Sequence, residues 1–297
     1  MSKQKIRQVI DRQLPTAGMA GIGVKGVQLF RVTEPVACAP AVYEPTVVAI
    51  VSGTKEAILD GNRHVYDSRR YLCCPMSMPV EAGTPAASPE NPLLGVLISL
   101  DTRVLSEMNL EMERAGGPLR KPAKEPNSAG LTLAQWDTDF SEALLRLVEL
   151  ATEPVDAAVL GEGRLREFYY SVLKGESGPS VRQAFGVGNE IARTIEYLSA
   201  RLHEPVSIDE MAAHAGMSRA VFHRKFKQAT TMSPLQFAKS MRLNQAAMKI
   251  AGGMNVSEAA WHVGYVSTSQ FSREFKRMYG ETPKRWSQAT QFPAGVM

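Results

Sequence analysis

The sequence predicts an α+β protein: an N-terminal antiparallel β-barrel or sandwich with trailing helices, then an all-α domain that holds two helix-turn-helix units. Two patterns support this fold class. Short β-branched and apolar runs, separated by Gly and Pro, occupy roughly residues 41–101, as in small antiparallel barrels and sandwiches. Apolar residues at helical spacing then follow almost to the end of the chain. With 297 residues, the chain is long enough for two ordinary domains.

The predicted strands are short and are separated by recognisable turns. Residues 46–51 form a β-branched run that ends at Ser52-Gly53. Residues 56–59 are followed by Asp60-Gly61, the strongest short hairpin signal. Three further strands are expected over residues 64–66, 71–74 and 93–100.

Two apolar stripes predict helices after the strands, the first in a segment that starts near Thr132. The residues of the two stripes are Leu144, Leu145, Val148 and Leu150, and then Leu160, Leu165, Phe168, Tyr169 and Val172. Gly and Pro within residues 175–179 predict an exposed connection, so we place a domain boundary within 176–186. This gives an N-terminal domain over residues 1–178 and a C-terminal domain over residues 186–290.

The net charge of +4 conceals a difference between the two halves. Residues 186–297 carry 14 Lys and Arg against 8 Asp and Glu, whereas residues 1–185 carry 20 against 22. A basic domain beside a slightly acidic one fits a phosphate-binding module attached to a sensor. Two solvated surfaces that merely differ in composition would give the same numbers, so charge alone does not decide between these readings.

The C-terminal half contains a two-helix unit that begins at Ser207. Ser207 is a good N-cap for a short helix, Gly216 supplies the turn, and Ser218 caps the next helix. The residues expected to face inward are Ile208, Met211, Ala212, Ala215, Val221, Phe222 and Phe226. The opposite stripe of the second helix consists of Ala220, His223, Arg224 and Lys227.

The same design recurs about 50 residues later. Ser257 is expected to start the first helix, Gly264 marks the turn, and Ser267 caps the second helix. The residues expected to face inward are Ala259, Ala260, Val263, Phe271, Phe275 and Met278, and the outward ones are Ser269, Ser272, Arg273 and Lys276. Hydroxyl and guanidinium groups on the exposed face of a short capped helix are what readout of the DNA major groove requires.

One long helix is predicted between the two units. Ser233-Pro234 is an N-cap followed by a first-turn proline, and the helix continues to about Ala251. Its core-facing stripe is Leu243, Ala246, Ala247 and Ile250. A helix of this length spans roughly 28 Å, close to the ~34 Å between major grooves on one face of DNA. Such a spacer can hold two recognition helices in successive grooves.

These motifs resemble the AraC/XylS family of transcription regulators over residues 191–286. The stretches that carry the resemblance are Ala215-Gly-Met-Ser-Arg219, Phe222-His-Arg-Lys-Phe-Lys227, Ser233-Pro-Leu235, Ala259-Ala-Trp-His-Val-Gly-Tyr265, Ser267-Thr-Ser-Gln-Phe-Ser-Arg-Glu-Phe-Lys276 and Gly280-Glu-Thr-Pro283.

The resemblance implies which residues contact DNA bases. In the first unit they are Ala220, His223 and Arg224, and in the second they are Thr268, Ser269, Ser272 and Arg273. We add Lys227 and Lys276, which lie on the same two exposed stripes. Ala220 is small enough that we expect it to reach only a thymine methyl group. For the short hydroxyl side chains, water-mediated or phosphate contacts are an alternative to direct hydrogen bonds.

The N-terminal half resembles, less specifically, the ligand-sensing barrel of one AraC-type subgroup. The relevant stretches are residues 43–55, Tyr71-Leu72, Met78-Pro-Val80 and Ala87-Ser-Pro89. This implies a cupin-like β-barrel whose pocket binds a small effector, followed by helices that dimerise. The expected partners are therefore double-stranded DNA, a small-molecule effector, RNA polymerase (as an activator) and a second copy of the chain. No cofactor and no metal are expected.

An enzyme is one alternative, since cupin-like barrels often hold a catalytic metal. Such a site needs several His and carboxylate ligands. The N-terminal half has one histidine, His64, which we interpret as a hydrogen-bonded strand residue. The sequence thus disfavours a cupin-type enzyme fused to a DNA-binding domain.

A second alternative is a regulator that senses electrophiles or oxidants through Cys73 and Cys74. A reactive thiol needs a lowered pKa and some exposure, and Arg69 and Arg70 are near enough in sequence to stabilise a thiolate. Cysteine also packs well in a buried strand, which is the commoner role. Adjacent residues of a strand point to opposite faces, so we expect the pair to be structural.

Targeting and redox signals predict a cytoplasmic protein without a membrane segment. No run approaches the roughly 18 apolar residues of a membrane span, and the basic N-terminus lacks the apolar stretch of a signal peptide. The three cysteines are too few for a disulfide framework.

Overall fold

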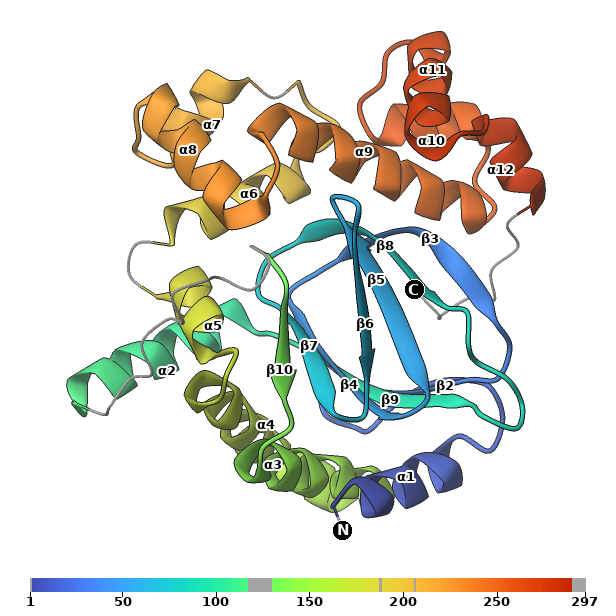
Figure 1. Cartoon of the computed structure of the whole chain (residues 1–297). Helices are drawn as coiled ribbons and strands as arrows, with labels where there is room; N and C mark the ends of the chain where they lie inside the picture. The colour runs from blue at the N-terminus through green and yellow to red at the C-terminus, as the bar shows by residue number, and fades with distance from the viewer. Residues whose placement is uncertain (1, 117–129, 187–188, 206, 290–297) are drawn as a thin grey trace.

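The computed structural model describes residues 2–116, 130–186, 189–205 and 207–289. Its N-terminal half contains two antiparallel sheets (Figure 1). In order across the larger sheet lie β1 (Gly18–Gly21), β2 (Val27–Val32), β9 (Leu93–Ser99), β4 (Thr46–Ser52), β7 (Arg70–Cys74) and β10 (Thr132–Gln135). Across the smaller sheet lie β3 (Val36–Tyr43), β8 (Met78–Thr84), β5 (Thr54–Leu59) and β6 (Asn62–Asp67).

The two sheets pack against each other around one apolar core. Ile50 and Leu72 of the larger sheet share this core with Ala57 and Val80 of the smaller one. The described strands form two separate sheets and not one closed ring. The predicted α+β fold class is confirmed, with an open cupin-like sandwich in place of a closed barrel.

Strand β4 is apolar along most of its length because both of its faces are buried. Val48 and Ile50 face the smaller sheet, while Val47 and Ala49 face the helices on the other side. A strand that is buried on both faces reads as a continuous apolar run. The predicted hairpin between β5 and β6 is also confirmed, because Asp60 and Gly61 both have positive φ (48° and 77°), as a two-residue type I′ turn requires.

Helices cover the outer face of the larger sheet. They are α1 (Ser2–Gln13), α3 (Thr138–Val148), the 3₁₀ turn η1 (Glu149–Thr152) and α4 (Pro154–Lys174) (Figure 1). Tyr71 of β7 stacks on Phe140 of α3, with ring centroids 4.0 Å apart. The prediction that a helix starts near Thr132 is wrong: residues 132–135 form β10 and pair with β7, and α3 begins only after its N-cap Asp137.

The expected exposed connection near residue 177 is also wrong. Residues 178–185 form helix α5 (Gly178–Phe185), which packs against α4 and α2 (Thr102–Arg114). Ser177 is fully buried, and its hydroxyl hydrogen-bonds with the Tyr71 hydroxyl at 2.7 Å. The chain thus returns to the N-terminal core before it enters the C-terminal half.

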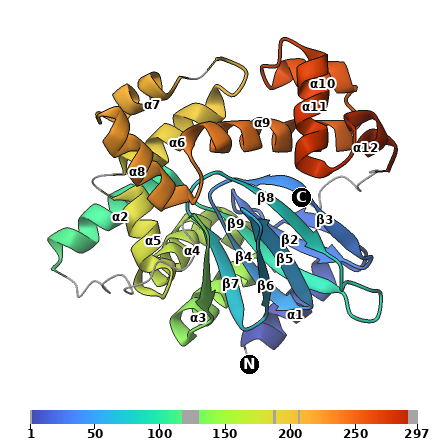
Figure 2. The same cartoon turned by 45° about the horizontal axis from the view of Figure 1, so that its top comes forward.

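Every regular element in the described part of the C-terminal half is a helix. These helices are α6 (Glu190–Ala200), α7 (Ile208–His214), α8 (Arg219–Thr230), α9 (Pro234–Ala251), α10 (Val256–His262), α11 (Thr268–Tyr279) and α12 (Pro283–Ala289). Figures 1 and 2 show α9 as a long spacer with one helical lobe at each end, lying over the edge formed by β3 and β8. Helix α9 has 18 residues, which corresponds to about 27 Å.

None of the helices in the described ranges is both long and apolar enough to cross a membrane.

Candidate nucleic-acid interface and internal pocket

The first lobe presents α8 as an exposed, well-supported helix. Ser207 and Glu210 form a capping box at the start of α7, and Gly216 takes φ +63° at the turn. Behind α8, the rings of Phe222, Phe226 and Phe237 form a fully buried aromatic cluster. The four predicted site residues of α8 are all exposed: Ala220, His223, Arg224 and Lys227.

The second lobe repeats this arrangement with two corrections. The N-cap of α10 is Asn255, whose side chain accepts from the Glu258 backbone N–H, and not Ser257. Met278 is 40% exposed, and Tyr279 packs against Phe275 instead. Ser267 caps α11 as predicted. Of the site residues, Thr268, Ser269, Arg273 and Lys276 are exposed and Ser272 is half-buried.

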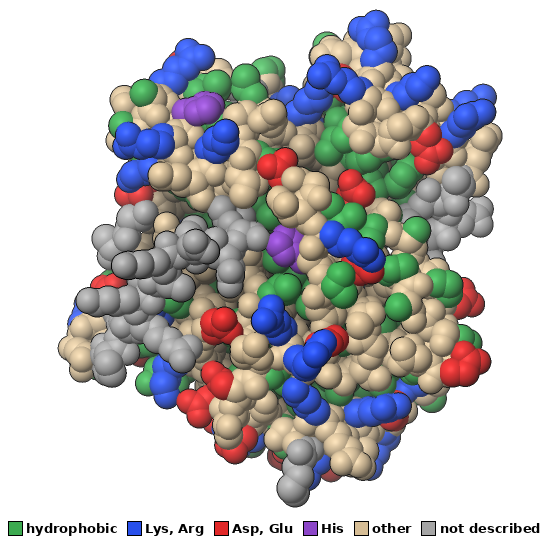
Figure 3. Space-filling view, in the orientation of Figure 1, with side chains coloured by type: hydrophobic (Ala, Val, Ile, Leu, Met, Phe, Trp, Pro, Cys, Tyr) green, Lys and Arg blue, Asp and Glu red, His purple; other side chains and the backbone are tan. Residues whose placement is uncertain are grey.

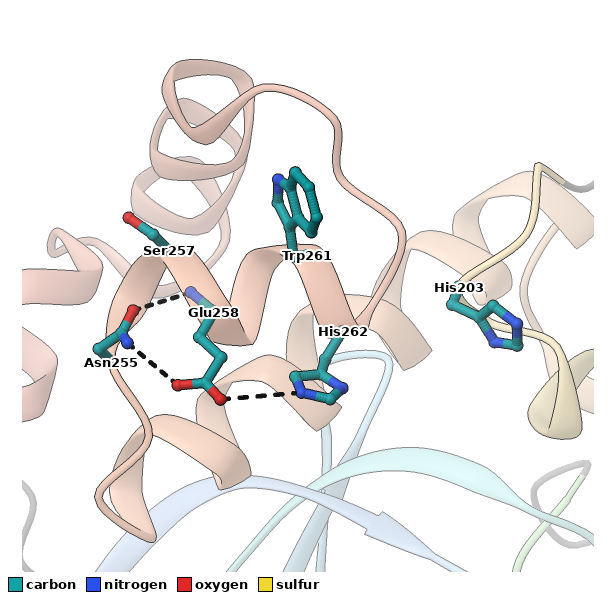
Figure 4. A pocket seen from close by; sticks show the side chains of 6 residues that line it. All are labelled: His203, Asn255, Ser257, Glu258, Trp261 and His262. Atoms are coloured by element: carbon teal, nitrogen blue, oxygen red, sulfur yellow. Dashed lines mark hydrogen bonds and ion pairs between the residues drawn. The ribbon is translucent and has the colours of Figure 1, made fainter.

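Basic side chains gather on the surface of both lobes. Figure 3 shows Lys and Arg over the α7–α8 lobe and again over the α10–α12 lobe. Between α10 and the chain after α6 lies an open groove, which the sequence analysis did not identify. Its lining residues are His203, Asn255, Ser257, Glu258, Trp261 and His262 (Figure 4). Trp261 is 74% exposed, so a large apolar ring borders the groove.

A second cavity of about 420 Å³ lies within the N-terminal half. Most of its lining side chains are apolar, and they come from both sheets. They are Met19, Phe30, Val32, Val42, Pro45, Val48, Leu93 and Leu97, accompanied by Gly18, Gln28, Tyr43, Glu44, Thr46, Lys55 and Ser99. Because the cavity is closed on several sides and mostly apolar, it has the character of a small-molecule site.

Lys55 supplies a positive charge to this cavity. Among the described residues, its ammonium group forms no hydrogen bond or ion pair. Burial in apolar surroundings lowers the pKa of Lys55 to about 8. The cavity's carboxylate, Glu44, is engaged elsewhere, because it accepts a hydrogen bond from the Ser77 hydroxyl at 2.5 Å. An unpaired cation in an apolar cavity favours an anionic occupant.

Two buried tyrosine hydroxyls lie near this cavity. Tyr43 lines the cavity, and its Oη atom and that of Tyr66 are buried and close enough to interact with each other. Burial raises the pKa of both groups, so they stay neutral, and the Tyr43 hydroxyl can donate a proton to a bound oxygen atom.

His64 does not make the hydrogen bond that we expected of it. Its Nε2 atom is buried without a partner among residues 2–116, 130–186, 189–205 and 207–289, and burial lowers the pKa of the imidazole. In the same ranges, no three His, Cys, Asp or Glu side chains come together as a set of metal ligands.

Cys73 and Cys74 lie on opposite faces of β7, as predicted. Cys73 packs in the core beneath the helices, and Cys74 packs in the core between the sheets. Burial raises the pKa of the Cys73 thiol to about 12 and raises that of Cys74 as well. Arg69 pairs with Asp67 at 2.8 Å and not with a thiol. These surroundings are the opposite of those that activate a cysteine.

Comparison with known proteins identifies both halves. A family model described as AraC-type transcriptional regulator N-terminus matches residues 23–180, and a helix-turn-helix domain model matches residues 211–289. The chain is 37% identical over 81 residues to the HTH-type transcriptional regulator MtrA of Neisseria gonorrhoeae, which is 27% of each protein. It is also 30% identical over 94 residues to the regulatory protein SoxS of Salmonella typhimurium. This match covers 31% of this chain and 88% of SoxS.

Similarity in three dimensions extends over nearly the whole chain. ToxT of Vibrio cholerae superposes with a TM-score of 0.58 and 12% sequence identity, over 93% of this chain and 98% of ToxT. A ToxT structure with bound (E)-4-(8-methylnaphthalen-1-yl)but-3-enoic acid gives the same TM-score at 13% identity, over 91% of this chain and 98% of ToxT. At this identity the likeness shows a shared fold.

The chain matches only part of its curated relatives. Its match to MtrA spans 27% of that protein, and its match to the probable transcriptional regulator LumQ of Photobacterium leiognathi spans 37% of LumQ. The N-terminal family model, by contrast, covers more than half of this chain. The chain belongs to the AraC-type transcriptional regulators.

Proposed function

We propose that this chain is a sequence-specific DNA-binding transcription regulator that is controlled by a small effector bound between its two sheets. The observation that carries the proposal is the pair of helices α8 and α11 at opposite ends of α9, each with an exposed face of polar and basic residues. Ser267 caps α11, whereas Ser218, at the N-cap position of α8, makes no capping hydrogen bond with its side chain. Such helices fit the major groove, and α9 sets their spacing near one helical repeat of DNA.

Within this interface the side chains have different tasks. Arg224 and Arg273 read bases, because a guanidinium group can donate two parallel hydrogen bonds to guanine. Lys227 and Lys276 neutralise phosphates, and His223 lies between the two kinds of contact on α8. Ala220 meets a thymine methyl group, and Thr268, Ser269 and Ser272 act directly or through water.

The effector we propose is a small apolar acid. Lys55 supports this proposal, since a bound carboxylate would pair with an ammonium group that otherwise has no partner. ToxT, the structural relative, has been solved with an unsaturated fatty acid and with an arylbutenoic acid bound. The cavity of about 420 Å³ has room for a molecule of that kind.

We assign a different task to each half of the chain. Residues 1–178 would bind the effector and dimerise, and residues 186–290 would bind DNA. Val155 and Val159, one helical turn apart on α4, are 74% and 75% exposed, which supports a homodimer formed through this helix. We further propose that the protein acts in the cytoplasm, where the chromosome lies, and activates transcription by RNA polymerase. Transcription in vitro with purified polymerase tests this activation.

DNA selection tests the central claim. The full-length protein is mixed with fragmented genomic DNA from the host, and bound fragments are enriched and sequenced. We expect a recurring asymmetric site about two helical turns long, because two different recognition helices occupy successive grooves. Enrichment no greater than that of random DNA, measured at the same salt concentration, would overturn the proposal.

A further inference from the structure

One buried side chain joins the DNA-binding half to the N-terminal half. Asn244, in the middle of α9, is only 2% exposed. Its Nδ2 atom donates to the backbone carbonyl of Ala41 at 2.7 Å and to that of Val80 at 2.8 Å. Its Oδ1 atom accepts from the Tyr279 hydroxyl at 2.6 Å. Both donors and one acceptor site of the amide are thereby used.

The geometry of this contact is specific. Ala41 and Val80 are register partners on the neighbouring strands β3 and β8, so a single amide bridges both strands at one level. One turn further along α9, the Sδ atom of Met248 lies 3.3 Å from the Val42 backbone N–H. Figures 1 and 2 show α9 over these two strands in both views.

Strand β3 serves the internal cavity as well. Val42 and Tyr43 line the cavity, and the neighbouring Ala41 holds Asn244. On the other side of Asn244, Tyr279 is the last residue of α11, the second recognition helix. A continuous chain of contacts therefore runs from the cavity through β3 and Asn244 to α11.

We expect this contact to be either fully made or broken. The amide is hydrogen-bonded to two buried carbonyl groups and one half-buried hydroxyl, and a partly broken arrangement would leave buried polar groups without partners. Elements with two discrete arrangements are those that transmit binding from one site to another.

We infer that Asn244 and Tyr279 are positioning residues that clasp the second helix-turn-helix unit to the cavity strand β3 and pass the occupancy of the cavity to α11. The inference rests on the proposed function, since it assigns the route by which an effector alters DNA binding. In this chain the effector signal enters the DNA-binding half through the middle of α9.

The clasp itself is tested without DNA or effector. In the full-length protein, amide hydrogen exchange is measured over residues 36–43 and 78–84 for the wild type, Asn244→Ala and Tyr279→Phe. The matched control is Gln245→Ala, the next residue of α9, whose half-buried side chain makes no hydrogen bond among the described residues. We expect exchange to rise about tenfold in Asn244→Ala, less in Tyr279→Phe, and not in the control. Unchanged exchange in Asn244→Ala would overturn the clasp.

Signal transmission is tested by filling the cavity with a side chain instead of an unidentified ligand. Leu97→Trp, or Val48→Phe if the first variant does not fold, is combined with Asn244→Ala, and the Kd for the selected DNA site is measured. We expect cavity filling to change the Kd at least about fivefold in the wild-type background and less than about twofold beside Asn244→Ala.

Equal changes in both backgrounds, or no change in either, would overturn the transmission role. If the wild type bound no specific site, the proposed function would fail instead, and the exchange experiment would still decide whether the clasp exists.

Discussion

At the scale of single residues, the exposed face of α8 combines two kinds of positive charge. Arg224 and Lys227 are both exposed, but only the planar guanidinium group of Arg224 can pair with one base edge through two hydrogen bonds. Arg224→Ala should weaken specific binding by about 1–3 kcal/mol and relax the preference at one base pair.

Competition between the selected site and random DNA measures this effect. Lys227→Ala serves as the matched control, and it should weaken both kinds of DNA alike and lower the salt dependence of binding. If Arg224→Ala also weakened both equally, Arg224 would be a phosphate contact and the assigned readout would be wrong.

Lys55 gives effector binding a pH dependence of known sign. Because burial lowers the pKa of Lys55 to about 8, the ammonium form is lost as pH rises through 8. A carboxylate needs that form, so its affinity should be highest below pH 8 and fall above it. The other ionisable groups nearby shift away from this pH: burial raises the pKa of Tyr43, Tyr66 and Cys38, and Arg63 lowers that of Glu56.

Calorimetry with 4-phenylbutanoate, and with the neutral 4-phenylbutanol as control, measures this dependence between pH 6.5 and 9.5. Lys55→Met should abolish the preference for the acid. Equal affinity for acid and alcohol in the wild type would show that Lys55 does not select the ligand.

The two adjacent cysteines carry a prediction of stability. Replacing Cys73 and Cys74 together by Ser places two hydroxyl groups in largely apolar cores, which should lower the free energy of unfolding by about 1–3 kcal/mol at position 73. The loss should be smaller at position 74, where the thiol already donates to the backbone carbonyl of Met76 at 3.1 Å. Urea titration measures the loss, and transcriptional regulation should persist. A variant that folded normally but lost a response to an oxidant or aldehyde would restore thiol sensing as the mechanism.

At the scale of elements, the predictions from sequence succeeded where local chemistry decides the structure. The caps at Ser207, Ser233 and Ser267, the Asp60-Gly61 hairpin and the apolar strand β4 follow from neighbouring residues, and all are confirmed. Ser218 stands at the N-cap position of α8 as predicted, but its side chain makes no capping hydrogen bond. The N-cap of α10 was placed two residues late because Ser257 and Asn255 are both good cap residues. Strand β10 was missed because its partner β7 lies about 60 residues earlier, and pairing over that distance leaves no local pattern.

The two turn glycines of the DNA-binding half differ in a way that can be measured. Gly216 and Gly264 both have positive φ, at +63° and +84°. A Cβ atom on Gly216 would meet nothing within 4 Å, whereas one on Gly264 would lie 2.6 Å from the backbone oxygen of His203. Gly216→Ala should therefore cost only the strain of a left-handed residue, about 1–2 kcal/mol.

Gly264→Ala should lower the free energy of unfolding clearly more than Gly216→Ala, because a backbone atom cannot move aside as a side chain can. Urea titration of both variants at one pH gives the comparison. Equal losses of free energy of unfolding in the two variants would mean that the backbone near His203 can move to accommodate the added Cβ atom. The close approach at Gly264 would then not contribute to stability.

At the scale of the whole molecule, the docking of the two halves was not predictable from sequence. Asn244 stands beside a core-facing stripe, and a polar residue at such a position reads as a solvent-exposed side chain of an amphipathic helix. Its partners Ala41 and Val80 offer backbone carbonyls, which leave no trace in residue identity. The cavity was expected from family resemblance alone. Lys55 appeared in the sequence analysis only as the last residue of the stretch 43–55. That its side chain lines the cavity depends on the strand register, which the sequence alone does not give.

The homodimer that we propose is also a property of the whole molecule, and it is assigned to one face of α4. Val155, Val159 and Tyr170 lie on one face of α4 by helical spacing, and all three are exposed although other residues of α4 are buried in the core. A second copy related by a two-fold axis would cover this face with the same residues. Val155→Glu combined with Val159→Glu should therefore shift the protein from dimer to monomer in sedimentation at micromolar concentration, since like charges would meet across the axis.

The control is Val266→Glu, which places the same charge on a residue that is 96% exposed in the turn before α11. It should leave the oligomeric state unchanged. Because each monomer keeps both recognition helices, the double variant should still bind one asymmetric site, with the loss confined to DNA that carries two sites. A double variant that remained dimeric would show that the copies meet elsewhere, and the exposed apolar face of α4 would then have no part in assembly.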